Sequence, residues 1–242
     1  MLKMLLARLR QGRRTMSFPP PIPALPERFR GRPVLVRHEP DQIPLIDLGA
    51  SLFSPEETQA CPPGTMRFGS EYAMATRTRE GLRTSTGEVK LAAALEKQTR
   101  RLFGRSLRLR SVSAGSCSGC EAELIALGNV VFDLARFGVQ FVASPRHADG
   151  LVVTGAVSQN MRLALEKTYH AMPEPKLVIA VGSCAISGGP FRGSPEVLDG
   201  VPAAIPVDLY IPGCPPHPLT ILDGVLRLLG RLESGERAQV RP

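Results

Sequence analysis

Four cysteines are the residues of this sequence best suited to chemistry. Cys117 and Cys120 lie in the segment GSCSGCEAE, and the other two are Cys184 and Cys214. Each segment follows an apolar run that we expect to form a buried strand, over residues 107–112, 177–181 and 207–211. Because the loops at the carboxyl ends of parallel strands line one crevice, the four thiols should meet there. Four thiolates in a glycine-rich pocket suit an iron–sulfur cluster or zinc.

The spacing of the cysteines bears on the kind of site. A structural zinc site usually pairs two close Cys-x2-Cys motifs, and this sequence has one, at Cys117 and Cys120. A lone Cys-x2-Cys motif is also typical of a redox dithiol or of half a zinc site. Two further cysteines at strand ends, of which Cys214 is followed by two prolines, favour a metal centre over a dithiol.

The composition is that of a globular protein with enough apolar residues, 43%, for a substantial core. Aromatic residues make up 5% and tryptophan is absent, so the formal net charge of +8 does not indicate a nucleic-acid partner. Five cysteines without the spacing of a disulfide framework favour a reducing compartment. No apolar run reaches the ~18 residues of a membrane-spanning helix, and the Arg13-Arg14 pair lacks the apolar stretch of a signal peptide.

The amino terminus has the pattern of a short amphipathic helix. Residues 1–16 place four leucines on one helical face, namely Leu2, Leu5, Leu6 and Leu9. The same residues carry five cations, namely Lys3, Arg8, Arg10, Arg13 and Arg14. Such a helix lies on a membrane surface or on a partner protein, although a frayed terminus has the same pattern. A proline-rich linker follows, and apolar spacing over residues 85–105 predicts a helix.

Beyond residue 106 the pattern alternates between strands and helices. We expect further strands over 139–143 and 151–154, and helices over 120–137, 159–172 and 218–232. This alternation predicts a parallel sheet with helices on both faces. The chain should therefore comprise a leader and linker (1–26), a small region (27–84), a connecting helix (85–106) and an α/β domain (107–242).

Residues 107–232 resemble the small electron-transfer subunit shared by membrane-bound energy-converting nickel–iron hydrogenases and respiratory complex I. The matching segments are GSCSGCEAEL, VTGAVS, AVGSCAISGG and IPVDLYIPGCPPHP. In the complex I branch the first two cysteines are adjacent. Here Ser118-Gly119 separates them, as in the formate hydrogenlyase and hydrogenase-4 type. The resemblance implies a flavodoxin-like α/β fold and one 4Fe–4S cluster, whose ligands would be Cys117, Cys120, Cys184 and Cys214.

What the resemblance implies is an electron relay that is not catalytic alone. The cluster would be the last relay to an active site in a large hydrogenase-type subunit, similar to the 49 kDa subunit of complex I. Ferredoxin-like and membrane-arm subunits would be further partners, and the expected location is the cytoplasmic face of the inner (plasma) membrane, as a peripheral protein. The alternative is the same relay in a complex I-like quinone oxidoreductase that lacks a nickel–iron centre. A zinc-bearing or clusterless assembly protein is the third hypothesis.

A second resemblance concerns residues 1–33, which look like the start of the ferredoxin-like subunit of the same hydrogenases. The cluster motif Cys-x2-Cys-x2-Cys-x3-Cys-Pro of that subunit falls on Ser51, Ser54, Glu57 and Cys61-Pro62. Three of the four ligands are therefore absent. This implies that residues 27–84 form a degenerate ferredoxin-like domain without a cluster.

Three side chains beside the cysteines each have two interpretations. Glu121 is either a proton conduit at the interface with the active site or, like Glu123, an acid that complements the dipole of a first helical turn. His217 follows Cys214-Pro-Pro. It either hydrogen-bonds the cluster or is a surface histidine at a helix start.

Overall fold

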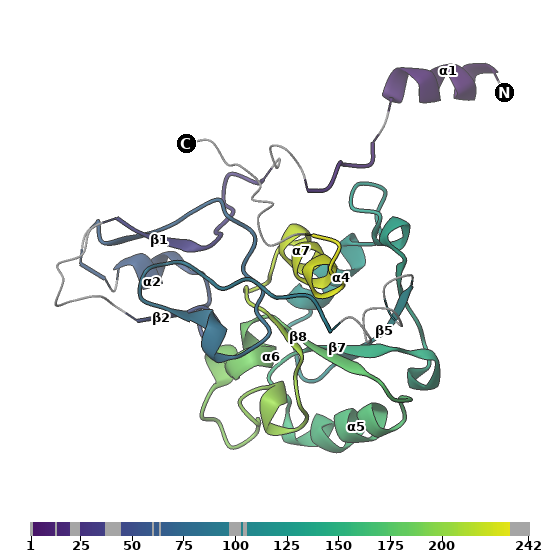
Figure 1. Cartoon of the computed structure of the whole chain (residues 1–242). Coiled ribbons are helices and arrows are strands. Elements are labelled where there is room, and N and C mark those ends of the chain that lie inside the picture. Colours follow the sequence, from purple (N-terminus) through teal and green to yellow (C-terminus); the bar gives the residue numbers. More distant parts are fainter. Residues whose placement is uncertain are drawn as a thin grey trace.

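A five-stranded parallel sheet forms the centre of the molecule (Figure 1). The structure, a computed structural model, describes residues 2–12, 14–19, 25–36, 45–59, 61–62, 64–96, 103 and 106–232. The strands are β5 (Leu107–Ser113), β6 (Val139–Phe141), β7 (Gly150–Thr154), β8 (Leu177–Val181) and β9 (Leu209–Ile211). Their spatial order β6-β5-β7-β8-β9 is the flavodoxin-like order 2-1-3-4-5. The predicted α/β class is confirmed.

The burial of the strands explains why they form this kind of sheet. Every residue of β7, β8 and β9 is buried, as expected for parallel strands that are covered on both faces. Strand β5 alternates at its start, with Leu107 and Leu109 buried and Arg108 exposed. Hydrophobic burial on both faces therefore fixes β7, β8 and β9. Cys184 follows β8, Cys214 follows β9, and β7 ends at Thr154.

Helices cover both faces of this sheet (Figure 1). Helices α4 (Gly119–Ala126) and α7 (Pro218–Leu228) lie on one face, and α5 (Gln159–His170) lies on the other. The short helix α6 (Ser183–Ser187) follows β8 directly. Helix α7 is buried along its whole length, because residues from the amino-terminal half of the chain cover its outer side.

Helix α4 is shorter than the predicted helix over 120–137. It ends at Ala126, and a separate 3-10 turn, η2 (Leu134–Phe137), follows. The Asn129 side chain accepts hydrogen bonds from the backbone N–H groups of Val131 and Phe132, at 2.8 and 3.1 Å. Because these bonds replace helical ones and Asp133 has a positive φ of 47°, the chain turns here. The apolar spacing did not reveal this break.

The elements in the described residues of the amino-terminal half are short. Helix α1 (Leu2–Gln11) projects away from the body (Figure 1). Strand β1 (Pro33–Leu35) pairs antiparallel with β3 (Met66–Phe68), and β2 (Ile46–Asp47) pairs antiparallel with β4 (Arg83–Thr84). The short helix α2 (Pro55–Gln59) and the 3-10 turn η1 (Glu80–Leu82) lie in the same part of the chain. The ferredoxin-like character of residues 27–84 stays a prediction.

The predicted helix over 85–105 is wrong for residues 85–96, which follow an irregular path; residues 97–102, 104 and 105 lie outside the described residues. The backbone N–H groups of Ala92 and Leu95 donate to the carbonyl groups of Ala75 and Leu228, at 2.8 and 2.9 Å. Ala92 and Leu95 are buried in the core around α7. Their apolar spacing therefore reflects burial of an irregular segment against a helix.

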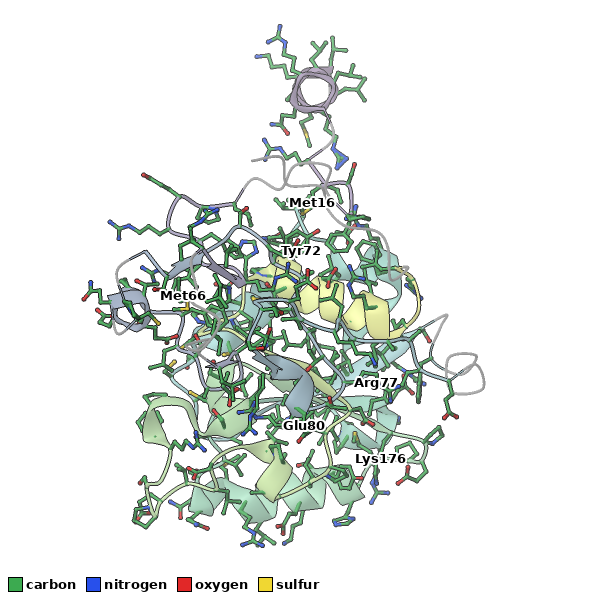
Figure 2. The ribbon with its side chains drawn as sticks, turned by 60° about the vertical axis from the view of Figure 1, so that its left-hand side comes forward. Met16, Met66, Tyr72, Arg77, Glu80 and Lys176 are labelled. Carbon is green, nitrogen blue, oxygen red and sulfur yellow. The ribbon has the colours of Figure 1, made fainter. Side chains whose placement is uncertain are left out.

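The amino-terminal half also closes one edge of the sheet. Thr76 exchanges two backbone hydrogen bonds with Tyr210 in β9, at 3.0 and 2.8 Å. Tyr72, which is 1% exposed, lies against α7 (Figure 2). Leu48 and Leu82 share one core cluster with Ile186 and Tyr210. The two halves of the chain therefore bury a common core.

A substitution at Gly224 in α7 tests how closely the amino-terminal half packs on this helix. A Cβ atom at Gly224 would lie 2.7 Å from the Cβ of Ala75, closer than real Cβ contacts allow. Alanine is the better helix former by about 1 kcal/mol, but overpacking costs about 1–3 kcal/mol. We expect Gly224→Ala to lower the thermal unfolding midpoint by roughly 2–8 °C, and the added Ala75→Gly change to restore part of it. A midpoint raised by Gly224→Ala alone would contradict the close contact.

Candidate metal centre

The four predicted cysteines all lie at the carboxyl edge of the sheet. Cys117 lies in the loop between β5 and α4, and Cys120 is in the first turn of α4. Cys184 lies in α6, directly after β8, and Cys214 lies between β9 and α7. Three parallel strands that end at one edge thus deliver four thiols to one region, as the sequence predicted.

The thiols lie within electrostatic reach of one another. Burial, with smaller contributions from Glu121 and the other three thiols, raises the pKa of Cys120 to about 12. Burial together with Cys214 and Cys117 raises the pKa of Cys184 to about 11. Burial raises the pKa of Cys214 as well. Burial therefore favours the neutral form of Cys120, Cys184 and Cys214, and a bound cation would reverse that preference.

The site is closed on one side and open on the other. Cys120 is buried and Cys184 is half-buried, whereas Cys117 and Cys214 are exposed. Gly182 has a φ of +89°, and a Cβ atom at this position would lie 2.5 Å from the sulfur of Cys120. The backbone therefore approaches the buried thiol directly, and only glycine fits there.

Glu121 connects the cysteine loop to strand β7. Its Oε1 accepts hydrogen bonds from the hydroxyl of Ser116 and, at 2.5 Å, from that of Thr154. Burial opposes ionisation of Glu121, but these hydrogen bonds outweigh it and hold the pKa of the carboxyl below its ordinary value. Its Oε2 is buried and has no hydrogen-bond partner among the described residues. Thr154 lies in the segment VTGAVS, but nothing in its spacing marked it as a partner of Glu121.

The two other side chains named from the sequence have structural contacts. The His217 Nδ1 accepts a hydrogen bond from the backbone N–H of Leu219 at 3.2 Å, so His217 caps α7. Its ring packs edge-on against Phe29 and Phe132, and burial lowers its pKa. His217 is therefore a half-buried cap. Glu123 is half-buried, and burial raises its pKa.

The positions aligned with the ferredoxin motif also approach this site. The Ser51 hydroxyl and the Leu52 N–H donate to the two carboxylate oxygens of Glu57, each at 2.6 Å. The charge of Glu57 contributes to the raised pKa of Cys214. Cys61 is half-buried beyond α2. The sequence analysis did not place Glu57 near the four thiols, because the contact depends on how the two halves pack.

The geometry of the thiols matters for the kind of metal centre. In the described part of the chain, no group of three or more His, Cys, Asp or Glu side chains is placed to hold a single metal ion.

The fold and the site together define a class: a flavodoxin-like domain with a four-thiol site at the carboxyl ends of its strands. Residues 117–228 match the family model described as NADH ubiquinone oxidoreductase, 20 Kd subunit. The matched range contains all four cysteines of the site. The chain belongs to this family, whose members include subunits of oxidoreductase complexes.

Curated relatives come from both branches of this family. The probable membrane-bound hydrogenase subunit mbhJ of Pyrococcus furiosus is 42% identical over 151 residues, which are 61% of this chain and 90% of that protein. An NADH-quinone oxidoreductase subunit of Heliobacterium modesticaldum is 47% identical over 116 residues, or 48% of this chain and 66% of that protein. Formate hydrogenlyase subunit 7 of Escherichia coli is 42% identical over 141 residues, or 58% of this chain and 55% of that protein. The chain thus spans only about half to two thirds of the last two relatives.

Proposed function

We propose that this chain is an electron-relay subunit that carries one 4Fe–4S cluster. Cys117, Cys120, Cys184 and Cys214 would be its ligands, and a large hydrogenase-type partner subunit would house the active site. The observation that carries the proposal is the convergence of these four thiols at one edge of the sheet, in a chain of the 20 kDa subunit family.

The cysteine spacing favours a cluster over a structural zinc ion. A structural zinc site usually has two close Cys-x2-Cys pairs, and this sequence has one such pair and two distant cysteines. A cube of iron and sulfide is wider than one ion and takes four thiolates around its outside. This comparison also counts against the zinc-bearing assembly protein as the function.

The chain's own residues would control the surroundings of such a centre, which supplies single-electron transfer when bound. The buried Cys120 and half-buried Cys184 keep one side away from water, whereas the exposed Cys117 and Cys214 leave the other side accessible. Ile125 in α4 and Val130 after it are 77% and 59% exposed. Exposed apolar side chains in and after the helix that begins at the cysteine loop fit the docking of a partner subunit.

The hydrogenase-type complex is our first choice because of the cysteine spacing. Two residues separate Cys117 from Cys120, and relatives named as hydrogenase and formate hydrogenlyase subunits are among those that match. The second candidate is a relay in a complex I-like quinone oxidoreductase, which the match to an NADH-quinone oxidoreductase subunit favours. The sequence of the large subunit encoded beside this chain distinguishes them: two Cys-x2-Cys pairs indicate nickel–iron ligands, and their absence indicates the quinone-linked complex.

Helix α1 supports a peripheral position at the cytoplasmic face of the inner membrane. In the described part of the chain, every helix is too short or too polar to cross a bilayer. All residues of α1 are exposed, including Leu5 at 63% and Leu9 at 72%. Met16, which lies between α1 and the body in Figure 2, donates a backbone hydrogen bond to Val131. An exposed apolar stripe with nearby cations fits an anionic lipid surface.

The ligand set is tested by replacing each cysteine in turn. We expect Cys117→Ala, Cys120→Ala, Cys184→Ala and Cys214→Ala each to abolish the EPR signal of the reduced cluster, because a 4Fe–4S core needs four thiolates. The reconstituted wild-type chain should contain about four irons. Cys61→Ser is the matched control and should change neither the iron content nor the absorbance. About eight irons, or a signal lost with Cys61, would mean that residues 27–84 hold a cluster.

The role of α1 is tested with lipid vesicles. Replacing Leu5 and Leu9 by serine removes apolar surface and keeps every cation, so binding to vesicles rich in phosphatidylglycerol should fall by roughly tenfold or more. Added salt should weaken wild-type binding, because part of the attraction is electrostatic. The iron content should stay the same. Equal sedimentation of both proteins with the vesicles would exclude the lipid-binding role.

The proposed proton conduit is tested in the assembled complex. Glu121→Gln should slow proton-coupled turnover by roughly tenfold or more and leave the cluster EPR signal intact, because the amide cannot carry a proton in the same way. Thr154→Val is the matched control, since it removes a hydrogen bond to Glu121 and keeps the carboxylate. If both variants slow turnover equally, Glu121 serves only to anchor the loop.

A further inference from the structure

We infer that residues 47–53, the clamp loop, position the Cys184 ligand from the amino-terminal half of the chain. This inference rests on the proposed function, because it takes Cys184 to be a cluster ligand. The clamp loop lies between β2 and α2. It touches α6 from outside the α/β part of the chain, so the thiol site depends on a segment more than a hundred residues away in sequence.

Two buried hydrogen bonds connect the clamp loop to α6. The hydroxyl of Ser183 donates to the carbonyl of Ser51. The hydroxyl of Ser187 donates to the carbonyl of Gly49 at 2.7 Å. Ser183 is 1% exposed and Ser187 is 7% exposed, so water does not compete for these bonds. Ser183 and Ser187 lie on either side of Cys184 in α6. Their hydrogen bonds therefore fix the position and the rotation of that helix relative to the clamp loop.

The clamp loop is itself held by an ion pair. Arg79 donates from Nη1 and Nη2 to the two carboxylate oxygens of Asp47, at 2.6 and 2.7 Å. The same carboxylate accepts the backbone N–H of Gly49 at 3.0 Å. These hydrogen bonds outweigh the opposing effect of burial, and the pKa of Asp47 lies below its ordinary value. A two-bond contact with a planar guanidinium fixes direction as well as distance.

Gly49 shows that the clamp has no free space. A Cβ atom at Gly49 would lie 2.7 Å from Arg79 Nη1 and 2.7 Å from the Cγ2 of Ile186 in α6. The φ of Gly49 is not positive, so space alone excludes a side chain. Ile186 is 2% exposed and belongs to the shared core. The loop is therefore packed between the ion pair on one side and the Cys184 helix on the other.

The far end of the clamp loop is held to helix α2. The Ser51 hydroxyl and the Leu52 N–H donate to the Glu57 carboxylate, and the Phe53 N–H donates to the Ser51 hydroxyl at 3.0 Å. The loop is therefore fixed at both of its ends, by Arg79 at Asp47 and by Glu57 at Ser51 and Leu52.

The position of Cys184 is tested first in the metal-free chain. We would measure iodoacetamide labelling of each cysteine by mass spectrometry in wild type and in Gly49→Ala. The inserted methyl group displaces the clamp, so labelling of Cys184 should accelerate by about tenfold through local opening, and that of Cys117 should stay within about twofold. Gly128→Ala is the matched control, because its Cβ would make only ordinary contact. Ser187→Ala removes one clamp bond without added volume and should act in the same direction. Thermal unfolding would be recorded for every variant to separate positioning from global stability.

The two proposals can fail separately. If no cluster forms in the wild-type chain, the electron-relay function is wrong, and the labelling experiment still decides whether the loop holds Cys184. Unchanged Cys184 labelling in both Gly49→Ala and Ser187→Ala, or equal acceleration of all four thiols, would overturn the clamp.

Discussion

The parallel register of four strands is the constraint on which the thiol site depends. Ser113 pairs with Thr154, Val153 with Ala180, and Val181 with Ile211, so the strands end at one level. The loops that follow therefore begin side by side at one edge of the sheet. The last strand residue before each loop is held in place by pairing with a neighbouring strand. A shift of one residue in any strand would turn its side chains to the opposite face. The continuous burial of β7 and β8 makes such a shift costly.

The amino-terminal half acts as an additional layer over this sheet. It pairs with the edge of β9 through Thr76, and its residues Ala75, Ala92 and Leu95 are buried in the same core as α7. Removing this half would expose apolar side chains of α7 to water. The α/β part is therefore not the self-sufficient unit that an alternation of strands and helices indicates.

Sequence patterns predicted those features that depend on neighbours along the chain. Long apolar runs such as 177–181 predicted the strands and where they end. The strand ends in turn predicted that the four thiols lie at one edge of the sheet. The same patterns were wrong where long-range packing decided the conformation. Leu95 has helical spacing but binds Leu228 as part of an irregular segment, and Asn129 ends a helix that apolar spacing would continue. The hydrogen bond of Ser183 to Ser51 has no local signal in the sequence, since it joins the two halves.

The pairing of Thr76 with Tyr210 has a consequence for the order of events during synthesis. Thr76 leaves the ribosome long before its partner exists, because β9 is among the last elements to be made. Contacts between residues so distant in sequence form slowly, since a long loop must close first. Strands β5, β7 and β8 can assemble earlier from nearby segments. The edge of β9 and the Cys214 loop are therefore completed after the strand ends that carry Cys117, Cys120 and Cys184.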